Sequence, residues 1–355
     1  MTVHDPILAA AQRARATIPD DTAMLRAAAE LTRDYSVANP RIYWPDMLGS
    51  ALIGWAAMAG AIVAENMAIA IVCGLVAMMA LYRAASFIHE LTHIRKGALP
   101  GFRFGWNLIV GIPLMIPSFL YEGVHTQHHA RTRYGTAEDP EYLPLALMKP
   151  WSLPLFILVA SLAPVGLILR FGLLTPLSLI LPPLRRKVVA ELSALSINPA
   201  YRRRAPEGDF ARMWAWQEAG ACLFALALVG SVFVFGWKPL LVYMAIHSAM
   251  TVVNQLRTLV AHLWENEGDP MTVTAQYLDS VNVPPPGVLP ELWAPVGLRY
   301  HALHHLLPSV PYHALGQAHA RLIATLDGDS PYHRGNYPGM IPLVGKIARS
   351  TMGAR

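Results

Sequence analysis

Residues 47–93 read MLGSALIGWAAMAGAIVAENMAIAIVCGLVAMMALYRAASFIHELTH, and this stretch decides the fold class. From Met47 to Tyr82 it is apolar with a single charge, Glu65, beside Asn66. The two polar residues divide it into halves near the ~20 residues that an α-helix needs to cross a bilayer. We expect a hairpin with spans near residues 47–64 and 67–88. If the second helix continues unbroken, His89 lies about 10 Å beyond Tyr82, just past the cytosolic membrane surface.

The rest of the chain also indicates a membrane protein. Of its 355 residues, 54% are hydrophobic and 14% are charged, whereas a soluble domain carries about 25% charged residues. A second hairpin is expected at residues 219–237 and 239–256. Glu65 and Lys238 fall on the outer turns and most arginines on the other side, which the positive-inside rule assigns to the cytosol.

Residues 1–46 are polar, alternate in the manner of a short amphipathic helix and begin with no signal-peptide pattern. We expect them to form a cytosolic N-terminal segment, with residues 47–355 as the membrane domain. The stretch at 104–121 is apolar but rich in glycine and proline. Because a crossing there would separate the histidines before and after it, we predict a re-entrant or interfacial segment. For residues 151–184 we also predict a re-entrant or interfacial segment. These residues cross the membrane twice or not at all.

Two composition features exclude other classes. Cys73 and Cys222 lie in apolar stretches without CxxC spacing, which excludes a disulfide framework and a thiolate metal site. The net charge is +5, but dense basic runs occur only at residues 185–187 and 202–204, where they fit cytosolic loops better than nucleic-acid binding.

Histidine is the unusual residue, with fourteen in the chain. Three clusters, HELTH, HTQHH and HALHH, place histidines three or four residues apart, so that each cluster can lie on one face of a helix. Nine neutral ligands suit two metal ions, and a set poor in carboxylates suits iron or copper better than calcium or magnesium. The candidate ligands are His89, His93, His125, His128, His129, His262, His301, His304 and His305.

Two other interpretations of the clusters remain open at this point. HELTH also fits the HExxH pattern of zinc peptidases, with Glu90 as general base, but a peptidase leaves most of the other histidines unexplained. A non-catalytic protein that stores or senses metal would use the histidines without chemistry.

The sequence resembles the membrane fatty acid desaturase and hydroxylase superfamily, whose three histidine boxes are HxxxH or HxxxxH, HxxHH and HxxHH. The resemblance extends from about Tyr43 to about Leu322 and is greatest to the bacterial branch. It implies an all-α integral membrane protein in which a four-helix transmembrane stem carries a cytosolic helical cap with a histidine-rich, non-haem di-iron site. The box histidines match the family's iron ligands, and His262 matches the lone histidine after the last span. Thr258 stands where related animal enzymes have a water-binding asparagine.

The resemblance further implies an O₂-dependent fatty-acyl desaturase in the bacterial inner membrane, acting on a lipid-linked or thioester-linked acyl chain. The alternative is a di-iron hydroxylase of a lipid or alkyl chain, because both reactions begin with the same hydrogen abstraction. The chain has no nucleotide or haem motif. We therefore expect an external electron donor, a ferredoxin or similar acidic carrier that docks on the basic stretch from Arg185 to Arg204.

Metal-bound imidazoles usually donate their other N–H to a carboxylate. The expected partners are Glu90, Glu122 and Asp139, with Glu138 and Glu265 as further candidates. Glu122 and Asp139 are favoured because they flank the second box.

Overall fold

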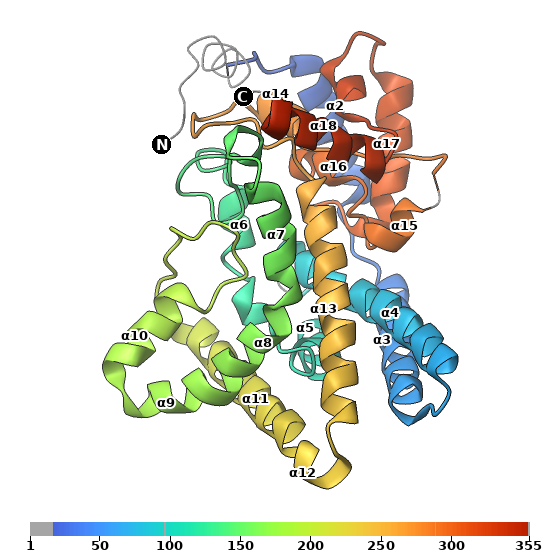
Figure 1. Cartoon of the computed structure of the whole chain (residues 1–355). Helices are drawn as coiled ribbons and strands as arrows, with labels where there is room; N and C mark the ends of the chain where they lie inside the picture. Colours follow the sequence, from blue (N-terminus) through green and yellow to red (C-terminus); the bar gives the residue numbers. More distant parts are fainter. Residues whose placement is uncertain (1–16, 96, 288, 354–355) are drawn as a thin grey trace.

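All regular structure is helical in the part of the chain that the computed structural model describes, residues 17–95, 97–287 and 289–353. Figure 1 shows two layers, a stem of long helices and, above it, a cap of short helices and loops. The first and last described helices, α2 (Thr22–Tyr35) and α18 (Met340–Gly353), both belong to the cap. This confirms the predicted all-helical class. Residues 1–16 of the expected N-terminal segment lie outside the described residues.

The first two long helices form the hairpin expected from the sequence. α3 (Pro40–Val63) and α4 (Met67–His93) lie side by side, and the Asn66 side chain caps the first turn of α4. A Cβ on Gly54 would lie 2.6 Å from Leu81 Cγ, so the close approach of the two helices requires glycine there. α4 is unbroken to its end and carries the first histidine pair out of the stem.

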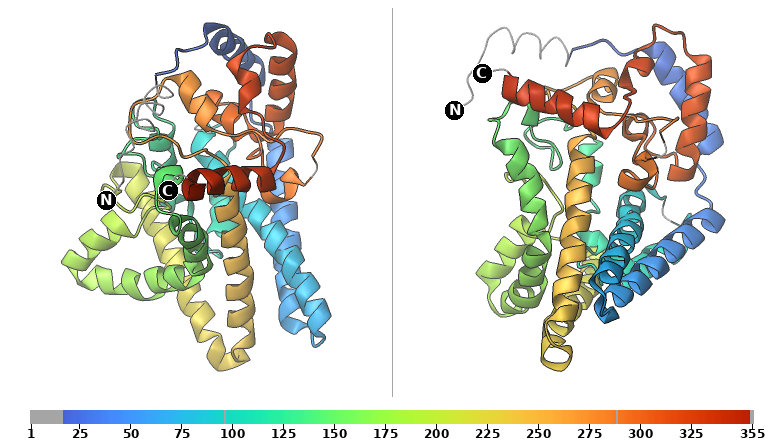
Figure 2. Two further views of the ribbon diagram at one scale, coloured as in Figure 1. Left: turned by 45° about the horizontal axis from the view of Figure 1, so that its top comes forward. Right: turned by 45° about the vertical axis from the view of Figure 1, so that its right-hand side comes forward.

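The second pair of long helices differs in its limits from the prediction. α11 (Gly208–Gly230) begins well before residue 219 and is followed by α12 (Val232–Phe235) and α13 (Lys238–Leu259). The helix includes the charged residue Glu218, because two arginines neutralise this carboxylate within the fold. Arg170 and Arg185 each lie 2.7 Å from it. In Figure 2, α13 stands between α3 and α4 on one side and, on the other, α7 (Ser152–Ser161), α8 (Ala163–Ile168) and α9 (Thr175–Ile180).

Four segments are long and apolar enough to cross a membrane, by length and composition: Pro40–Val63, Met67–His93, Ala163–Ile180 and Gly208–Phe235. Ala163–Ile180, within the stretch predicted to be re-entrant or interfacial, comprises α8 (Ala163–Ile168), η4 (Leu169–Leu174) and α9 (Thr175–Ile180). α13 is absent from this set because its second half carries polar residues such as Asn254. Which of these helices cross the bilayer stays a prediction.

Residues 104–121 fold back on themselves. They comprise α5 (Phe102–Trp106), the π-helical turn η1 (Asn107–Gly111) and the 3₁₀ turn η2 (Ser118–Leu120). The Asn107 side chain donates to Ser118 Oγ at 2.9 Å and accepts from Ser118 N at 2.8 Å. A straight helix would separate these residues by about 16 Å, so this segment does not run across the stem, in line with a re-entrant geometry.

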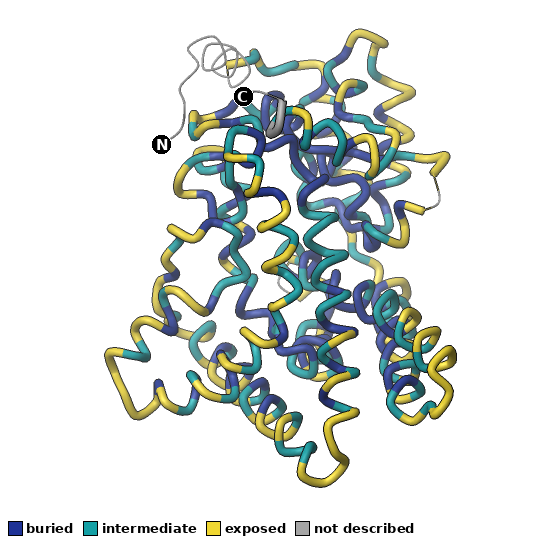
Figure 3. Tube along the Cα trace, viewed as in Figure 1, coloured by how far each residue is buried: buried dark blue, intermediate teal, exposed yellow. Residues whose placement is uncertain are grey.

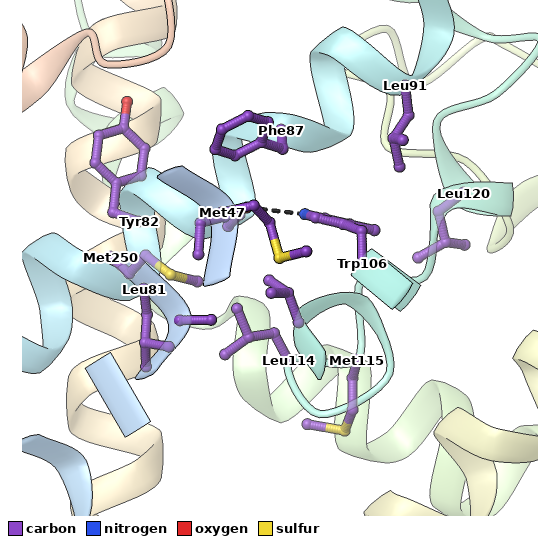
Figure 4. Close-up of a cluster of buried hydrophobic side chains, with 14 of the residues drawn as sticks. Met47, Leu81, Tyr82, Phe87, Leu91, Trp106, Leu114, Met115, Leu120 and Met250 are labelled. Carbon is purple, nitrogen blue, oxygen red and sulfur yellow. Dashed lines mark hydrogen bonds between the residues drawn. The ribbon is translucent and has the colours of Figure 1, made fainter. Parts of the chain in front are cut away.

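The folded-back segment completes the core of the stem. Figure 4 shows Trp106 and Leu114 beside Met47 and Leu81 of the first hairpin, and Met115 belongs to the same buried cluster. Figure 3 shows buried residues gathered where the cap meets the stem, whereas the far ends of the long helices are exposed. These exposed surfaces are apolar, with Phe233 91% and Leu52 72% exposed, as is expected of helices that face lipid.

The cap is assembled from helices near both ends of the chain. α2 buries Met24, Ala28 and Leu31 against α17 (Tyr312–Thr325). α18 lies across the upper ends of α7 and α13, where Ile347 joins a buried cluster with Leu153 and Leu259 (Figure 2).

The remaining short helices are α6 (His125–His128), η3 (Leu145–Leu147), α7 (Ser152–Ser161), α10 (Pro182–Glu191), α14 (Val273–Asp279), α15 (Pro290–Trp293), α16 (His301–Leu306) and η5 (Pro331–Gly335).

Candidate metal centre

Four pieces of chain bring histidines to the boundary between cap and stem. The last turn of α4 supplies His89 and His93, α6 and the residue after it supply the HTQHH cluster, α16 supplies the HALHH cluster, and His262 follows α13. Asn282 positions α16, since its Oδ1 accepts from Leu303 N at 2.9 Å.

The nine predicted histidines form two groups. Within each group, one nitrogen from every side chain lies within 4.8 Å of the others. The first group is His89, His93, His125, His129 and His304, and the second group is His128, His262, His301 and His305. No other His, Cys, Asp or Glu side chain of the described residues joins either group.

Helical spacing accounts for part of the division of the histidines into two groups. Residues four apart stay together, so that His125 pairs with His129 in the first group and His301 with His305 in the second. The middle histidine of each HxxHH cluster belongs to the other group, His128 to the second and His304 to the first. Each of these two clusters therefore serves both groups and links them.

Hydrogen bonds from outside fix the orientation of three of the rings. His125 Nδ1 lies 2.9 Å from Glu141 Oε1, and His128 Nδ1 lies 2.9 Å from Asp139 Oδ2. Because a carboxylate only accepts, each of these Nδ1 atoms carries the proton and leaves the Nε2 lone pair free. These rings are therefore held in the tautomer that binds metal through Nε2.

A longer relay holds His262. Its Nδ1 lies 2.8 Å from the Tyr134 hydroxyl, which in turn donates to Asp279 Oδ2 at 2.8 Å. Since the phenol proton is used by Asp279, the Tyr134 oxygen accepts from His262. His262 therefore also presents the Nε2 lone pair inward, toward His301 Nε2 at 3.0 Å.

The donor set fits metal ions. Nε2 atoms approach one another at 3.0–3.2 Å in both groups, and lone pairs that converge in this way repel unless a cation lies among them. His89 is buried with neither ring nitrogen hydrogen-bonded to a described residue. Uncharged imidazoles, four or five to a group and without carboxylates, suit a transition metal. The residues present therefore fit two such ions.

Electrostatics favour the neutral form that binds metal. Burial, reinforced by neighbouring histidines, lowers the pKa of His125, His129, His301 and His304 well below that of an exposed imidazole. For His128, burial is the largest single influence and lowers the pKa, but the charge and hydrogen bond of Asp139, together with the charges of Glu141 and Asp279, outweigh burial and raise the pKa. Asp139 is the largest of these acidic influences on His128.

Of the carboxylates predicted to hold metal-binding histidines, only some contact one. Asp139 contacts His128, as expected. Glu90 does not hydrogen-bond to a histidine, because its Oε1 is 3.8 Å from His89 Nδ1 while its other oxygen accepts from the Tyr43 hydroxyl and from Tyr312 N.

The expectation for Glu122 is wrong. Its carboxylate pairs with Arg103 Nε at 3.2 Å, and its backbone carbonyl accepts from Arg203. Glu138 is exposed and lies 3.6 Å from Arg133.

Sequence reasoning missed three residues that hold the rings. Glu141 follows Asp139 by two positions in the sequence EDPEY, and this short spacing within one loop was the available signal. Asp139 Oδ1 accepts from Glu141 N at 2.8 Å, so the first carboxylate also positions the second. Tyr134 and Asp279 come from distant parts of the chain, and no spacing rule connects them with His262.

A cavity of about 230 Å³ reaches the first group from the surface. Its lining includes Tyr43, Glu90 and His93, together with residues 36–38 and 308–311. A second cavity, of about 270 Å³, lies beside Asp279 on the other side of the cap. The first group is therefore connected to the outside through the partly exposed His93.

Comparisons with known proteins agree with this geometry. The family model described as "Fatty acid desaturase" matches residues 64–336, a range that includes all nine histidines. A protein named "Ceramide hydroxylase" from Caulobacter vibrioides (strain NA1000 / CB15N) is 48% identical over 331 residues, which cover 93% of this chain and 94% of that protein. No solved structure matches the chain.

Proposed function

Because the chain belongs to the fatty acid desaturase family and is an oxidoreductase, we propose that it is an O₂-dependent lipid hydroxylase with a pair of non-haem irons. The observation that carries the choice of reaction is the similarity to a ceramide hydroxylase over nearly the whole chain. It favours the hydroxylase alternative over the desaturase that the sequence analysis placed first. Because the chain is an oxidoreductase, the zinc peptidase and the metal-storage protein are no longer alternatives for its function.

In this proposal each histidine group holds one iron. The bound irons supply O₂ reduction and abstraction of hydrogen from an unactivated C–H bond. The net reaction inserts one oxygen atom into that bond and converts the other to water, with two electrons and two protons from outside. Asp139, Glu141 and Tyr134 hold the imidazoles in the metal-binding tautomer, and burial of the groups limits access of water.

The proposed substrate is a ceramide-like lipid of a bacterial inner membrane. The relative's name supports this lipid class, and the apolar, exposed surfaces of the stem support access from the bilayer. The active site and N-terminus would face the cytosol, because most arginines fall away from the outer turns at Glu65 and Lys238, on the side that the positive-inside rule assigns to the cytosol.

The electron donor would be a small acidic carrier such as a ferredoxin. Part of the basic stretch is used within the fold, since Arg185 pairs with Glu218, and the buried Arg203 donates to the carbonyls of Ser193 and Glu122. The docking surface is therefore narrower than the sequence indicated. It comprises the exposed side chains of Arg186, Lys187, Arg202 and Arg204, of which Arg202 also lies 3.9 Å from Glu191.

Expression in a host supplied with ceramide and a ferredoxin system tests this function. We expect ceramide that gains one oxygen atom with the wild type and not with His304→Ala, as measured by mass spectrometry of the extracted lipids. Loss of two hydrogen atoms without added oxygen would instead restore the desaturase interpretation. Wild-type protein that contains iron but modifies no lipid would contradict both.

A further inference from the structure

Arg257 is a cation in the last turn of α13, next to both histidine groups. α13 runs from the far end of the stem to the cap and packs against α4, which carries His89 and His93 (Figure 1). Arg257 is partly buried, and its Nε is sealed from solvent without a hydrogen-bond partner among the described residues. It therefore lies on the stem side of the metal centre, where a lipid would approach.

Position along the chain and helix packing place the guanidinium beside the metal centre. Arg257 precedes His262 of the second group by five residues. Its helix packs against α4, the helix that carries His89 and His93 of the first group. A side chain in the last turn of α13 is therefore next to the pieces of chain that supply both groups.

Arg257 has no carboxylate partner within ion-pair distance among the described residues. Its polar neighbours are uncharged, namely Asn254, whose Oδ1 lies 3.4 Å from Nη2, and the Tyr82 hydroxyl. Several other buried or partly buried arginines are paired with carboxylates: Arg83 with Asp46, Arg170 and Arg185 with Glu218, and Arg299 with Glu291. The buried Arg203 donates instead to two backbone carbonyls. A guanidinium has five N–H donors; the Nε donor of Arg257 has no acceptor among the described residues, and its Nη2 has a long contact of 3.4 Å with Asn254 Oδ1.

We propose that Arg257 binds an oxygen atom of the substrate's polar head and thereby directs hydroxylation to a carbon close to that head. This rests on the proposed function. A ceramide-like lipid carries an amide carbonyl and hydroxyl groups where its two chains meet, and these oxygens suit the guanidinium fork. A reaction in the middle of an acyl chain would instead place methylene groups against the guanidinium. The guanidinium would then lose its hydration without gaining a hydrogen-bond acceptor.

Equilibrium binding separates this role from catalysis. Iron-loaded protein in nanodiscs, without O₂ or reductant, is titrated with ceramide and with an alkane of the same chain length. Arg257→Met should weaken ceramide binding about tenfold or more, the loss expected for a charged hydrogen bond, and leave alkane binding unchanged. Arg257→Lys should show a smaller loss. Arg321→Met, a change at an exposed arginine paired with Asp34 on the cap, serves as the matched control.

Iron content and far-ultraviolet circular dichroism of each variant show whether the fold and the metal centre are intact. Turnover then provides a second readout, with a single position near the head for the wild type and a spread along the chain for Arg257→Met. Equal affinity of wild type and Arg257→Met for ceramide, or a parallel loss for both ligands, would overturn the proposal. Loss of iron from Arg257→Met would assign Arg257 a structural role and overturn the proposal. If Arg257→Met does not fold, the ceramide and alkane affinities of Arg257→Lys decide instead. Wild-type protein that binds ceramide but adds no oxygen would contradict the proposed function alone, because the affinities still decide the role of Arg257.

Discussion

Replacement of Asp139 by asparagine is the sharpest perturbation of the metal centre, because it changes charge at nearly constant volume. The carboxylate is fully buried and every one of its contacts is a donor. His128 Nδ1 lies 3.0 and 2.9 Å from its two oxygens, Gly135 N lies 2.9 Å from Oδ2, and Glu141 N lies 2.8 Å from Oδ1.

The magnitude follows from this arrangement. An asparagine has one oxygen and one NH₂ group, so one of the two backbone N–H groups would face a second donor. An unsatisfied buried N–H group costs about 1–3 kcal/mol, and we expect metal-free Asp139→Asn to be less stable by this amount. Loss of a carboxylate behind a metal-binding histidine lowers metal affinity by about 10- to 100-fold. This second effect should fall on the group that contains His128.

The assay is iron content per chain during titration with a chelator, combined with thermal unfolding of the metal-free protein in detergent. Asp139→Asn should release one iron at a lower chelator concentration than the wild type and should unfold at a lower temperature. Glu138→Gln is the control, because this neighbouring carboxylate is exposed and contacts only Arg133 at 3.6 Å. If Asp139→Asn holds both irons as tightly as the wild type, the role assigned to this carboxylate is refuted.

Three further predictions concern the two groups, the cap and the stem. His262→Ala leaves three imidazoles in its group, whereas His93→Ala leaves four, so elemental analysis should find a greater loss of iron for His262→Ala; equal losses would argue against the division into groups. Burial lowers the pKa of His319 to about 4, below the ~6.5 of an exposed histidine. The unfolded chain then binds a proton more readily, so the metal-free protein should lose stability as the pH falls from about 6.5 toward 4. Thermal unfolding should show a smaller decline for His319→Gln, and an unchanged decline would exclude this residue as the cause. Gly54→Val should destabilise the first hairpin by about 1–3 kcal/mol, because the added side chain would contact Leu81. Gly49→Ala is the control and should not destabilise the hairpin, because no atom lies within 4 Å of the added Cβ. Equal survival of both variants on heating would contradict this packing.

The sequence was sufficient for features that depend on local periodicity and length. The hairpin around Asn66 and the continuation of α4 to His93 follow from apolar length and an unbroken helical pattern. The nine histidines were recognisable because spacings of three and four place them on shared helical faces.

Features that depend on tertiary contacts were not predictable. The division of HTQHH and HALHH between two groups depends on how α6 and α16 face each other, which spacing alone does not determine. Glu122 was favoured for its position beside the second box, but Arg103 draws its carboxylate away from the histidines. The predicted span began at residue 219, where the uncharged apolar sequence begins, whereas α11 begins at Gly208 and includes Glu218, which Arg170 and Arg185 neutralise within the fold.

The most direct test of the central claim is incubation of purified, iron-loaded protein with ceramide, a reduced ferredoxin and isotopically labelled O₂. The account predicts that one labelled oxygen atom appears in the lipid, that it lies close to the polar head, and that His304→Ala abolishes the labelling. A lipid that loses two hydrogen atoms and contains no label, or labelling that persists in His304→Ala, would contradict it.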